Sequence, residues 1–235
     1  MPASPLSSQN QDALKQAAAE QALEFVRDRD IVGLGTGSTI RFFIEALAQR
    51  VKDGLQIQGV PTSRGTASLA AEFGIPLLQD EEEWNMRIAI DGADQVDPQF
   101  NLIKGGGGAL LREKIVARAA KEFIVIVDEG KRVPTLGPGF PVPVEVLPFG
   151  WPATAHELTW FGSDVSLRRL NGKPFRTDND HYILDLHVPT IADPQALETQ
   201  LNSIPGVMEN GLFTGMTSRL LVGTATRVEV LYPAS

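Results

Sequence analysis

Short apolar runs alternate with segments of helical spacing in the first part of the chain. A helical pattern over 12–26 precedes the apolar run Ile31–Leu34, and a helix-spaced segment follows the glycine-rich turn at 35–39. The same order recurs as the apolar run Ile57–Val60, a short turn and a helical pattern over 66–73. Two consecutive strand–helix units predict a parallel sheet, because parallel strands need a crossover connection.

The next two apolar runs each end abruptly in polar residues. Ile88–Ile90 leads into Asp91–Asp94, and Phe123–Val127 leads into Asp128–Lys131. The carboxyl ends of parallel strands meet at one edge of a sheet, where helix N-termini also converge, so these polar residues indicate a ligand-binding edge. Between the two runs, Lys104 precedes four consecutive glycines.

The character of the chain changes after Lys131, where five prolines fall between residues 134 and 148. We interpret this stretch as a crossing between domains. The order expected beyond it is strand, helix, strand, strand, helix, strand, which is the split βαβ arrangement of a small α+β domain. These elements are expected at 142–147, 154–161, 165–170, 182–188, 194–204 and 207–213.

The sequence therefore predicts an α/β protein in which a Rossmann-like parallel-sheet domain is joined to a second, smaller α+β domain of the ferredoxin-like type. Residues 1–132 are assigned to the first domain and 133–213 to the second. The last apolar segments, 220–223 and 228–231, are expected to return to the first sheet, so that 214–235 completes the first domain.

Composition narrows the classes of ligand. The chain has 21 Lys and Arg against 29 Asp and Glu, a net charge of −8, which argues against a nucleic-acid partner and favours a small, locally held anion. It has no cysteine, and its three histidines lack paired spacing, so we expect no thiolate chemistry and no metal site. No secretory signal or apolar membrane segment is evident, which predicts a cytoplasmic protein, or a stromal one if it comes from a plastid.

The turn at 35–39, GTGST, places glycines and three hydroxyls at a helix N-terminus, where free N–H groups and the helix dipole attract a phosphate. It lacks the third glycine of GxGxxG, and Pro61-Thr62-Ser63 replaces the acid expected at the end of the next strand, so a dinucleotide would lack its ribose partner. The alternative is a tight turn in which Ser38 or Thr39 caps the helix.

Asp91 and Asp94 frame a Gly-Ala turn and are expected to lie close to each other. Two close carboxylates separate their proton affinities, which suits the transfer of protons to and from sugar hydroxyls. Alternatively, one of them caps the next turn and the other is solvated. The glycines after Lys104 indicate positive φ angles or a close approach of backbone to ligand, and thus a second anion cradle, unless the loop is purely structural.

On the helix expected over 109–120, Glu113 falls on the inward arc, whereas Lys114 and Arg118 share a polar stripe. An inward carboxylate is partly desolvated, which strengthens it as a base unless a neighbouring cation offsets the effect. The alternative is a first-turn Glu that interacts with the helix dipole or with Arg112. Lys131 would bring a second ammonium to the ligand-binding edge, unless it is simply solvated.

Four motifs follow one another in a fixed order: GTGST at 35–39, DGAD at 91–94, KGGGGALLRE at 104–113 and VDEGK at 127–131. The second half adds VEVLPFGW at 144–151, TDND at 177–180 and GVMENGLF at 206–213. Together they resemble type A ribose-5-phosphate isomerase, and the resemblance covers nearly the whole chain from about Lys15 onward.

The resemblance implies a metal-free and cofactor-free interconversion of D-ribose 5-phosphate and D-ribulose 5-phosphate through an enediolate, in the pentose phosphate pathway and the Calvin cycle, by a homodimer or homotetramer. It gives Glu113 the role of the base, and Asp91 and Asp94 that of assisting ring opening and hydroxyl proton transfer. Lys104 and Lys131 would stabilise the oxyanion or hold the substrate. The substrate-binding residues that it implies are Thr36, Gly37, Ser38, Thr39, Asp91, Gly92, Ala93, Asp94, Lys104, Gly105, Gly106, Gly107, Lys131 and Lys15.

Three positions depart from the pattern of that family: Gln95 stands in place of Glu, Gly108 in place of Ala and Gly130 in place of Ser. Two other classes of function remain open. A sugar-phosphate sensor would not need an inward Glu113 and would usually carry a further domain. A nucleotide-dependent oxidoreductase is disfavoured by the missing ribose acid and third glycine.

Overall fold

The computed structural model describes residues 8–79 and 82–233. Contacts between residues divide the chain into two compact units. The first unit comprises the residues up to Gly92, Ala119–Lys131 and the residues from Ser218 on, and the second comprises Ala93–Arg118 and Arg132–Thr217. We call them the first unit and the second unit.

The first unit contains a six-stranded sheet in the order β15-β14-β6-β3-β1-β2. Every neighbouring pair is parallel except β14 and β15, so the predicted parallel sheet and the predicted return of the C-terminal segment are both confirmed. The strands are β1 (Asp30–Leu34), β2 (Ile57–Pro61), β3 (Ile88–Asp91), β6 (Glu122–Asp128), β14 (Arg219–Gly223) and β15 (Val228–Leu231).

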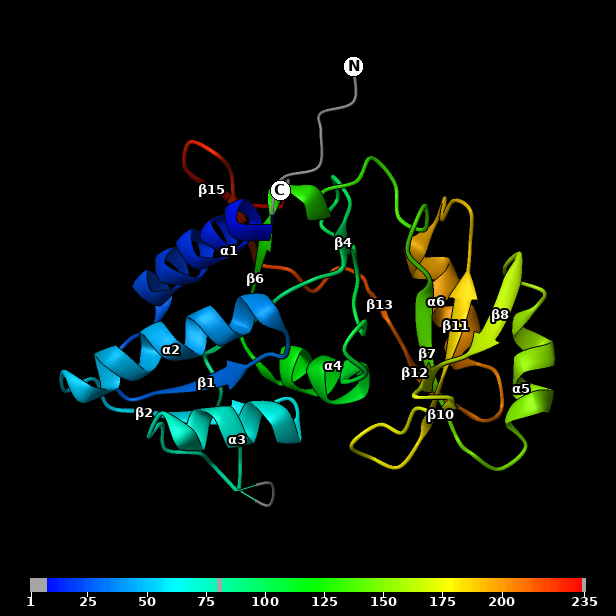
Figure 1. Ribbon diagram of the computed structural model, residues 1–235, viewed down its shortest axis with the longest axis horizontal. Helices are drawn as coiled ribbons and strands as arrows, with labels where there is room; N and C mark the ends of the chain where they lie inside the picture. Colours follow the sequence, from blue (N-terminus) through cyan, green and yellow to red (C-terminus); the bar gives the residue numbers. More distant parts are fainter. Residues whose placement is uncertain (1–7, 80–81, 234–235) are drawn as a thin grey trace. The chain divides into compact units, whose positions relative to one another are not determined.

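Three helices of the first unit pack against this sheet (Figure 1). They are α1 (Ser8–Ala22), α2 (Ser38–Lys52) and α3 (Arg64–Glu72); the short 3-10 turns η1 (Leu23–Phe25) and η2 (Glu129–Lys131) follow α1 and β6. Alternate strand residues share the core with these helices, because successive side chains of a strand point to opposite faces. Members of this core are Ala18, Phe43, Ile44, Leu47, Ala70, Val32, Leu34, Ile88, Ile90, Ile124 and Ile126.

The second unit is built on an antiparallel sheet in the order β12-β7-β11-β8. Its elements follow the predicted order of strand, helix, strand, strand, helix, strand, which confirms the split βαβ arrangement. They are β7 (Val142–Val146), α5 (Trp151–Leu158), β8 (Asp164–Leu167), β11 (Tyr182–His187), α6 (Pro194–Asn202) and β12 (Val207–Asn210). The core residues of this sheet include Val144, Leu184 and Leu186, which pack with Leu158 of α5 and Leu201 of α6.

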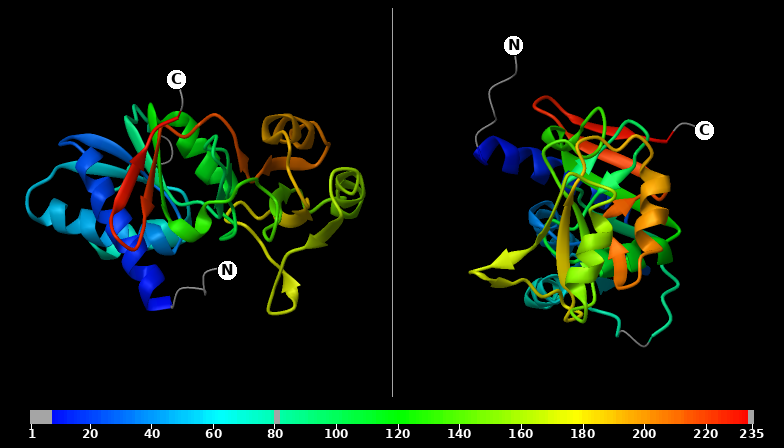
Figure 2. Two further views of the ribbon diagram at one scale, coloured as in Figure 1. Left: turned by 90° about the horizontal axis from the view of Figure 1, so that it is seen from above. Right: turned by 90° about the vertical axis from the view of Figure 1, so that its right-hand side faces the viewer.

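Several short elements of the second unit were not foreseen. β4 (Gln95–Val96), β5 (Leu102–Ile103) and β13 (Leu212–Phe213) form a three-stranded sheet. The hairpin of β9 (Arg169–Leu170) and β10 (Lys173–Pro174) projects from this unit (Figure 2). Strands of two residues leave no periodic pattern in the sequence, so their existence depends on partners that lie far along the chain.

The segment 93–118 groups with the second unit, whereas the sequence pattern assigned it to the first domain. It contains β4, β5 and most of α4 (Leu110–Ala119). The pairing of β5 with β13 ties this segment to the second unit. The strand expected over 207–213 is divided at Gly211, because its two halves pair with different strands. β12 pairs with β7, whereas β13 pairs with β5.

Candidate active site

The glycine turn of the first unit lies at the switch point of the parallel sheet. β1 is flanked by β2 on one side and β3 on the other, so the connections leave the sheet in opposite directions at the carboxyl ends of β1 and β3. The turn follows β1, and Asp91 ends β3. The backbone N–H of Thr36 donates to Oδ1 of Asp91 at 3.1 Å. The Asp91 carboxylate therefore holds the backbone of the glycine turn in place.

Asp91 is buried, and its Oδ1 accepts a second hydrogen bond, from the N–H of Gly92 at 2.7 Å. Two peptide donors compensate the desolvation of its carboxylate. Gly35 makes this arrangement possible, because a Cβ atom at that position would lie only 2.1 Å from Oδ1 of Asp91. A glycine is thus required where the turn passes Asp91.

The first residue of α2 is Ser38, and its N-cap is Gly37, at a φ of 122°. The alternative in which Ser38 or Thr39 caps this helix was wrong, since no side chain makes the capping bond. A serine cap is found on the next helix, α3, where Oγ of Ser63 accepts a hydrogen bond from the N–H of Thr66. An N-terminus without a side-chain cap keeps its positive dipole end for an anion.

Hydroxyl groups from the turn after β2 and from the first turn of α3 support the glycine turn. Oγ1 of Thr36 lies 2.8 Å from Oγ1 of Thr62, 2.9 Å from Oγ of Ser63 and 3.1 Å from Oγ1 of Thr66. The Pro-Thr-Ser turn that replaces a ribose-binding acid therefore has a structural task, which is to hold Thr36. This task follows from contacts between two separate turns and could not be read from either turn alone.

The two predicted site lysines of the first unit, Lys15 and Lys131, differ in their surroundings. Lys131 lies in η2, directly after β6, and has no hydrogen-bond or ion-pair partner in the described part of the chain. β6 neighbours β3 in the sheet, so its carboxyl end lies at the same edge as Asp91. Lys15, on α1, pairs with Asp12 one turn away, with Nζ 3.3 Å from Oδ1. Lys131 thus offers an uncommitted ammonium, whereas Lys15 has a partner on its own helix.

The second unit holds a buried ion pair between Lys104, which follows β5, and Glu113 of α4. Their side chains are 3% and 4% exposed, and Nζ of Lys104 lies 3.4 Å from Oε2 of Glu113. The predicted inward orientation of Glu113 is confirmed by this burial. The alternative partner, Arg112, instead donates from Nε to Oδ1 of Asn179 at 2.9 Å.

The prediction that Lys114 lies on a polar stripe of α4 was wrong. Lys114 is buried, and its Nζ lies 2.7 Å from Glu198 and 2.8 Å from Glu209. The ring of Phe213 faces both lysines, with its centroid 4.9 Å from Nζ of Lys114 and 5.5 Å from Nζ of Lys104. An aromatic face attracts a nearby cation, so Phe213 adds a favourable cation–π contact to each of the two buried ammonium groups.

The glycine loop after Lys104 approaches a second carboxylate. The N–H of Gly106 donates to Oδ2 of Asp94 at 2.8 Å, and a Cβ atom at Gly106 would lie 2.8 Å from Oδ1 of that residue. Gly105 has a φ of 98°. The positive φ expected of the glycine run is therefore confirmed at Gly105, and the close approach that the structure shows at Gly106 is to the carboxylate of Asp94.

Two of the three positions that depart from the family pattern have evident partners. Gln95 is buried and accepts from the N–H of Gly137 while it donates to the carbonyl of Pro138. Gly108 has a φ of 84°, and a Cβ atom there would lie 2.5 Å from the ring of Phe175. Its lack of a side chain makes room for that ring.

The predicted site residues fall into two sets, one in each unit, and the chain passes from one unit to the other between Gly92 and Ala93, inside the DGAD motif. The first set comprises Lys15, Thr36, Gly37, Ser38, Thr39, Asp91, Gly92 and Lys131. The second set comprises Ala93, Asp94, Lys104, Gly105, Gly106, Gly107 and Glu113.

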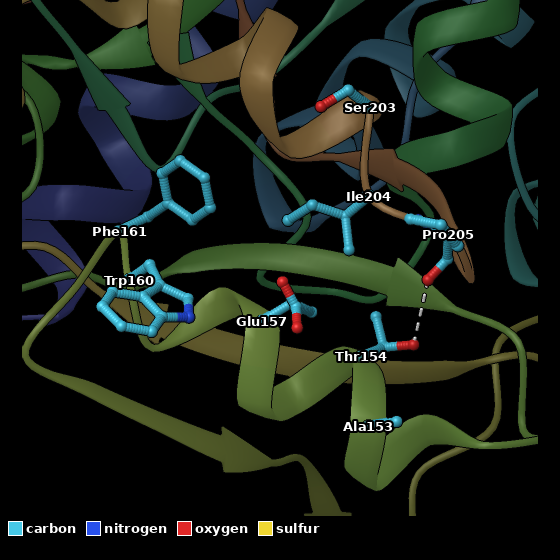
Figure 3. Close-up of a pocket in the computed structure, with 8 residues that line it drawn as sticks. All are labelled: Ala153, Thr154, Glu157, Trp160, Phe161, Ser203, Ile204 and Pro205. Carbon is cyan, nitrogen blue, oxygen red and sulfur yellow. Dashed lines mark hydrogen bonds between the residues drawn. The ribbon is translucent and has the colours of Figure 1, made fainter.

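A surface pocket of about 710 Å³ in the second unit contains none of these residues. It lies between α5 and the segment that follows α6 (Figure 3), and its lining is Ala153, Thr154, Glu157, Trp160, Phe161, Ser203, Ile204 and Pro205. Within residues 8–79 and 82–233, no group of three or more His, Cys, Asp or Glu residues is arranged to hold a metal ion. No helix in the same part of the chain has the length and apolar character needed to cross a membrane.

A glycine turn that leads into an uncapped helix N-terminus at the switch point of a parallel sheet, in a chain that also holds a buried carboxylate–ammonium pair, is typical of α/β enzymes that act on small anionic substrates. Comparisons with known proteins narrow this class. The family model for ribose 5-phosphate isomerase A (phosphoriboisomerase A) matches residues 58–227. The ribose-5-phosphate isomerase A of Gloeobacter violaceus is 50% identical over 225 residues, which cover 95% of this chain and 98% of that protein.

Solved structures agree with this result. The ribose 5-phosphate isomerase A of Methanocaldococcus jannaschii superposes with a TM-score of 0.90 at 41% identity, covering 94% of this chain and 99% of the other. That of Neisseria gonorrhoeae gives a TM-score of 0.89 at 41% identity, covering 96% and 98%. A further D-ribose-5-phosphate isomerase, solved in complex with phospho-erythronic acid, gives 0.91 at 43% identity, covering 94% and 99%. The chain belongs to the ribose 5-phosphate isomerase A family, as the motifs indicated.

Proposed function

We propose that this protein interconverts D-ribose 5-phosphate and D-ribulose 5-phosphate by proton transfer between C2 and C1 through an enediolate, without metal or cofactor. The observation that carries the proposal is the buried pair of Lys104 and Glu113 in a chain of this family. Aldose–ketose isomerisation needs a base for carbon, proton donors and acceptors for oxygen, and an electrophile for the developing oxyanion. The predicted residues supply each of these groups.

Glu113 is the base in this proposal. Its carboxylate takes the proton from C2 of the open-chain aldose and returns it to C1, so that the enediolate becomes the ketose. The ammonium of Lys104, 3.4 Å from Oε2, favours the ionised carboxylate that can accept a proton. Burial removes competing water from the pair and strengthens its electrostatic effect on the substrate.

Lys104 supplies the positive charge that stabilises the enediolate oxygen as the C2 proton leaves. Asp94, and in the other unit Asp91, assist ring opening and the movement of a proton between the oxygens of C1 and C2. Support for these roles comes from the donors that hold the two carboxylates, which are Gly106 N–H for Asp94 and the Thr36 and Gly92 N–H groups for Asp91. Fixed carboxylates lose little entropy when they transfer a proton.

The phosphate is assigned to the N-terminus of α2, with Thr36–Thr39, and to Lys131. The uncapped helix start and the uncommitted ammonium support this assignment. Lys15 contributes to phosphate binding in the same proposal, after exchanging its bond to Asp12 for one to the ligand. The remaining residues of the two sets, Gly92, Ala93 and Gly105–Gly107, contact the substrate through their backbone.

The cellular setting is part of the proposal. The substrate pair belongs to the pentose phosphate pathway and the Calvin cycle, which places the enzyme in the cytoplasm, and we infer a homodimer or homotetramer. Support comes from the resemblance to type A ribose-5-phosphate isomerases over nearly the whole chain and from the high coverage of the relatives. Light scattering during size-exclusion chromatography would determine the assembly.

The test is an assay of purified protein with ribose 5-phosphate in the presence of EDTA, followed by the appearance of ribulose 5-phosphate. We expect full activity with the chelator. Activity that disappears with EDTA and returns with a divalent metal would contradict the mechanism. A panel of other pentose and hexose phosphates serves as the control for substrate class, and a protein that binds ribose 5-phosphate without converting it would be a sensor instead.

A further inference from the structure

Arg168 of the second unit holds the glycine loop that follows Lys104. It lies between β8 and β9, and its side chain is 16% exposed. Nη1 donates to the carbonyl of Gly105 at 2.8 Å and to that of Gly106 at 3.1 Å. No motif in the sequence singled out this arginine, and the mechanism above assigns it no task.

Asp185 of β11 fixes the guanidinium of Arg168. Nε donates to Oδ2 at 2.9 Å and Nη2 donates to Oδ1 at 2.5 Å, a two-pronged pair that sets the plane of the guanidinium as well as its position. The remaining nitrogen of the guanidinium, Nη1, faces the glycine loop. A lysine could not reproduce this arrangement, because its ammonium lacks the planar fork.

The hydrogen bonds from Arg168 to the carbonyls of Gly105 and Gly106 fix the directions of the N–H groups of Gly106 and Gly107. The described chain has no cis peptide bond, and in a trans peptide the C=O and N–H of one unit point in opposite directions. When Arg168 holds the carbonyl of Gly105, the N–H of Gly106 is therefore directed away from the guanidinium. This N–H donates to Oδ2 of Asp94 at 2.8 Å.

The same reasoning applies to the next peptide. Arg168 also holds the carbonyl of Gly106, so the N–H of Gly107 is turned away from the guanidinium. Gly107 is exposed, and its N–H has no acceptor among the residues that the structure describes. An exposed, oriented peptide N–H is a ready donor for an oxygen of a bound sugar phosphate.

We propose that Arg168, anchored by Asp185, is a positioning residue of the isomerase: it orients the Gly105–Gly107 peptides so that one N–H holds Asp94 and the next is presented to a substrate oxygen. Glycine peptides rotate easily, since no side chain restricts them, and an external grip is what keeps these two in one orientation. The inference rests on the proposed function for its catalytic consequence, whereas the loop orientation itself is a property of the free protein.

Two readouts test the proposal. The first is the exchange rate of the Gly106 amide hydrogen, measured by NMR on the free protein. In Arg168→Met we expect this exchange to be about tenfold faster or more, because the peptide is no longer held toward Asp94. The matched control is Arg169→Met, which removes a neighbouring exposed arginine whose Nη1 donates to the carbonyl of Gly172 at 3.0 Å, away from the glycine loop. The Gly106 amide should exchange in this control as in the unchanged protein.

The second readout is steady-state kinetics with ribose 5-phosphate. In Arg168→Met and Arg168→Lys we expect kcat to fall on the order of 10- to 100-fold with a smaller change in KM, because the loop is misplaced while the phosphate-binding residues are intact. Added guanidinium ion should restore part of the kcat of Arg168→Ala, and sodium chloride at equal ionic strength should not. A residue that only stabilised the fold would show neither the kcat-specific loss nor this rescue.

Each outcome is decisive. Unchanged Gly106 exchange in Arg168→Met, or wild-type kcat in Arg168→Lys, would overturn the proposal. If Arg168→Met does not fold, Asp185→Asn tests the same grip, and it should accelerate Gly106 exchange and lower kcat. If the unchanged protein does not convert ribose 5-phosphate, the proposed function fails, and with it the catalytic part of this proposal; the amide exchange still decides whether Arg168 orients the loop.

Discussion

Replacement of Lys104 by Met perturbs the most deeply buried charge pair among the predicted site residues. Lys104 and Glu113 are both almost fully buried and lie 3.4 Å apart, so the substitution leaves the Glu113 carboxylate in a low-dielectric site without its ammonium. Removing one partner of a buried pair costs roughly 3–5 kcal/mol of unfolding free energy. At about 2–4 °C per kcal/mol for a chain of this size, the melting temperature should fall by roughly 6–20 °C.

Urea unfolding at pH 7 measures this cost, and a double variant separates its cause. In Lys104→Met/Glu113→Gln neither buried charge remains, and the loss should shrink to about 1–2 kcal/mol, since a buried pair replaced as a whole is often nearly neutral. The control Lys131→Met removes an ammonium that has no partner among residues 8–79 and 82–233, and it should change stability by less than about 0.5 kcal/mol. A double variant as unstable as Lys104→Met alone would refute the reasoning that an uncompensated carboxylate causes the loss.

Two further predictions concern the first unit. Burial tends to raise the pKa of Asp30, but hydrogen bonds from the Arg87 side chain and from a backbone N–H outweigh it and hold this pKa below its ordinary value. A lowered folded-state pKa stabilises the protein at a pH above the unfolded-state pKa of about 4, and this stabilisation is lost as the pH falls through the folded-state pKa. Asp30→Asn should therefore lower the free energy of unfolding by about 2 kcal/mol at pH 7 and by progressively less below pH 4. Urea unfolding at a series of pH values measures this difference. Gly35→Ala should lower the free energy of unfolding by about 1–3 kcal/mol and strongly reduce isomerase activity, because the added methyl group would lie 2.1 Å from Oδ1 of Asp91. The control is Gly65→Ala in α3, where the nearest atom would lie 3.8 Å from the added methyl group. This control should raise the free energy of unfolding by about 0.5–1 kcal/mol. Equal melting temperatures for the two alanine variants would count against the role of the close approach.

The elements of the parallel sheet could be predicted because each carries its own local signal. Ile31–Leu34 is an apolar run that ends in a glycine turn, and 57–60 repeats the pattern before a second helix. The turn, the strand and the helix N-terminus together already indicate an anion site, and the structure adds that Gly35 is needed for the passage of Asp91. Local chemistry was sufficient for this part of the protein.

The remainder depends on contacts between distant segments. The charge of Lys114 predicts exposure, and only Glu198 and Glu209, more than eighty residues further on, make its burial possible. Arg168 likewise lies in the strand expected over 165–170, but that pattern does not identify its partners, and its hydrogen bond to the carbonyl of Gly105 arises from tertiary structure alone. Partners of this kind are not encoded in any window of the sequence.

The DGAD motif shows the same limit at the site itself. Its two carboxylates are expected to lie close to each other, and the structure adds that the chain changes unit between Gly92 and Ala93 and that each carboxylate has peptide donors within its own unit. The residues were correctly identified as polar strand-end groups. Their individual hydrogen-bond partners could be found only in three dimensions.

Proton transfer at carbon by Glu113 is tested most directly by isotope exchange. Ribulose 5-phosphate is incubated with the protein in D₂O and EDTA, and ¹H NMR follows the loss of a C1 proton together with the formation of ribose 5-phosphate. The unchanged protein should catalyse both the exchange and the isomerisation. Glu113→Gln should slow both reactions by about 10²-fold or more, with a smaller effect on KM. The control Glu157→Gln makes the same change on an exposed face of α5 and should match the unchanged protein. Isomerisation and exchange at near wild-type rates in Glu113→Gln would contradict the assignment of the base.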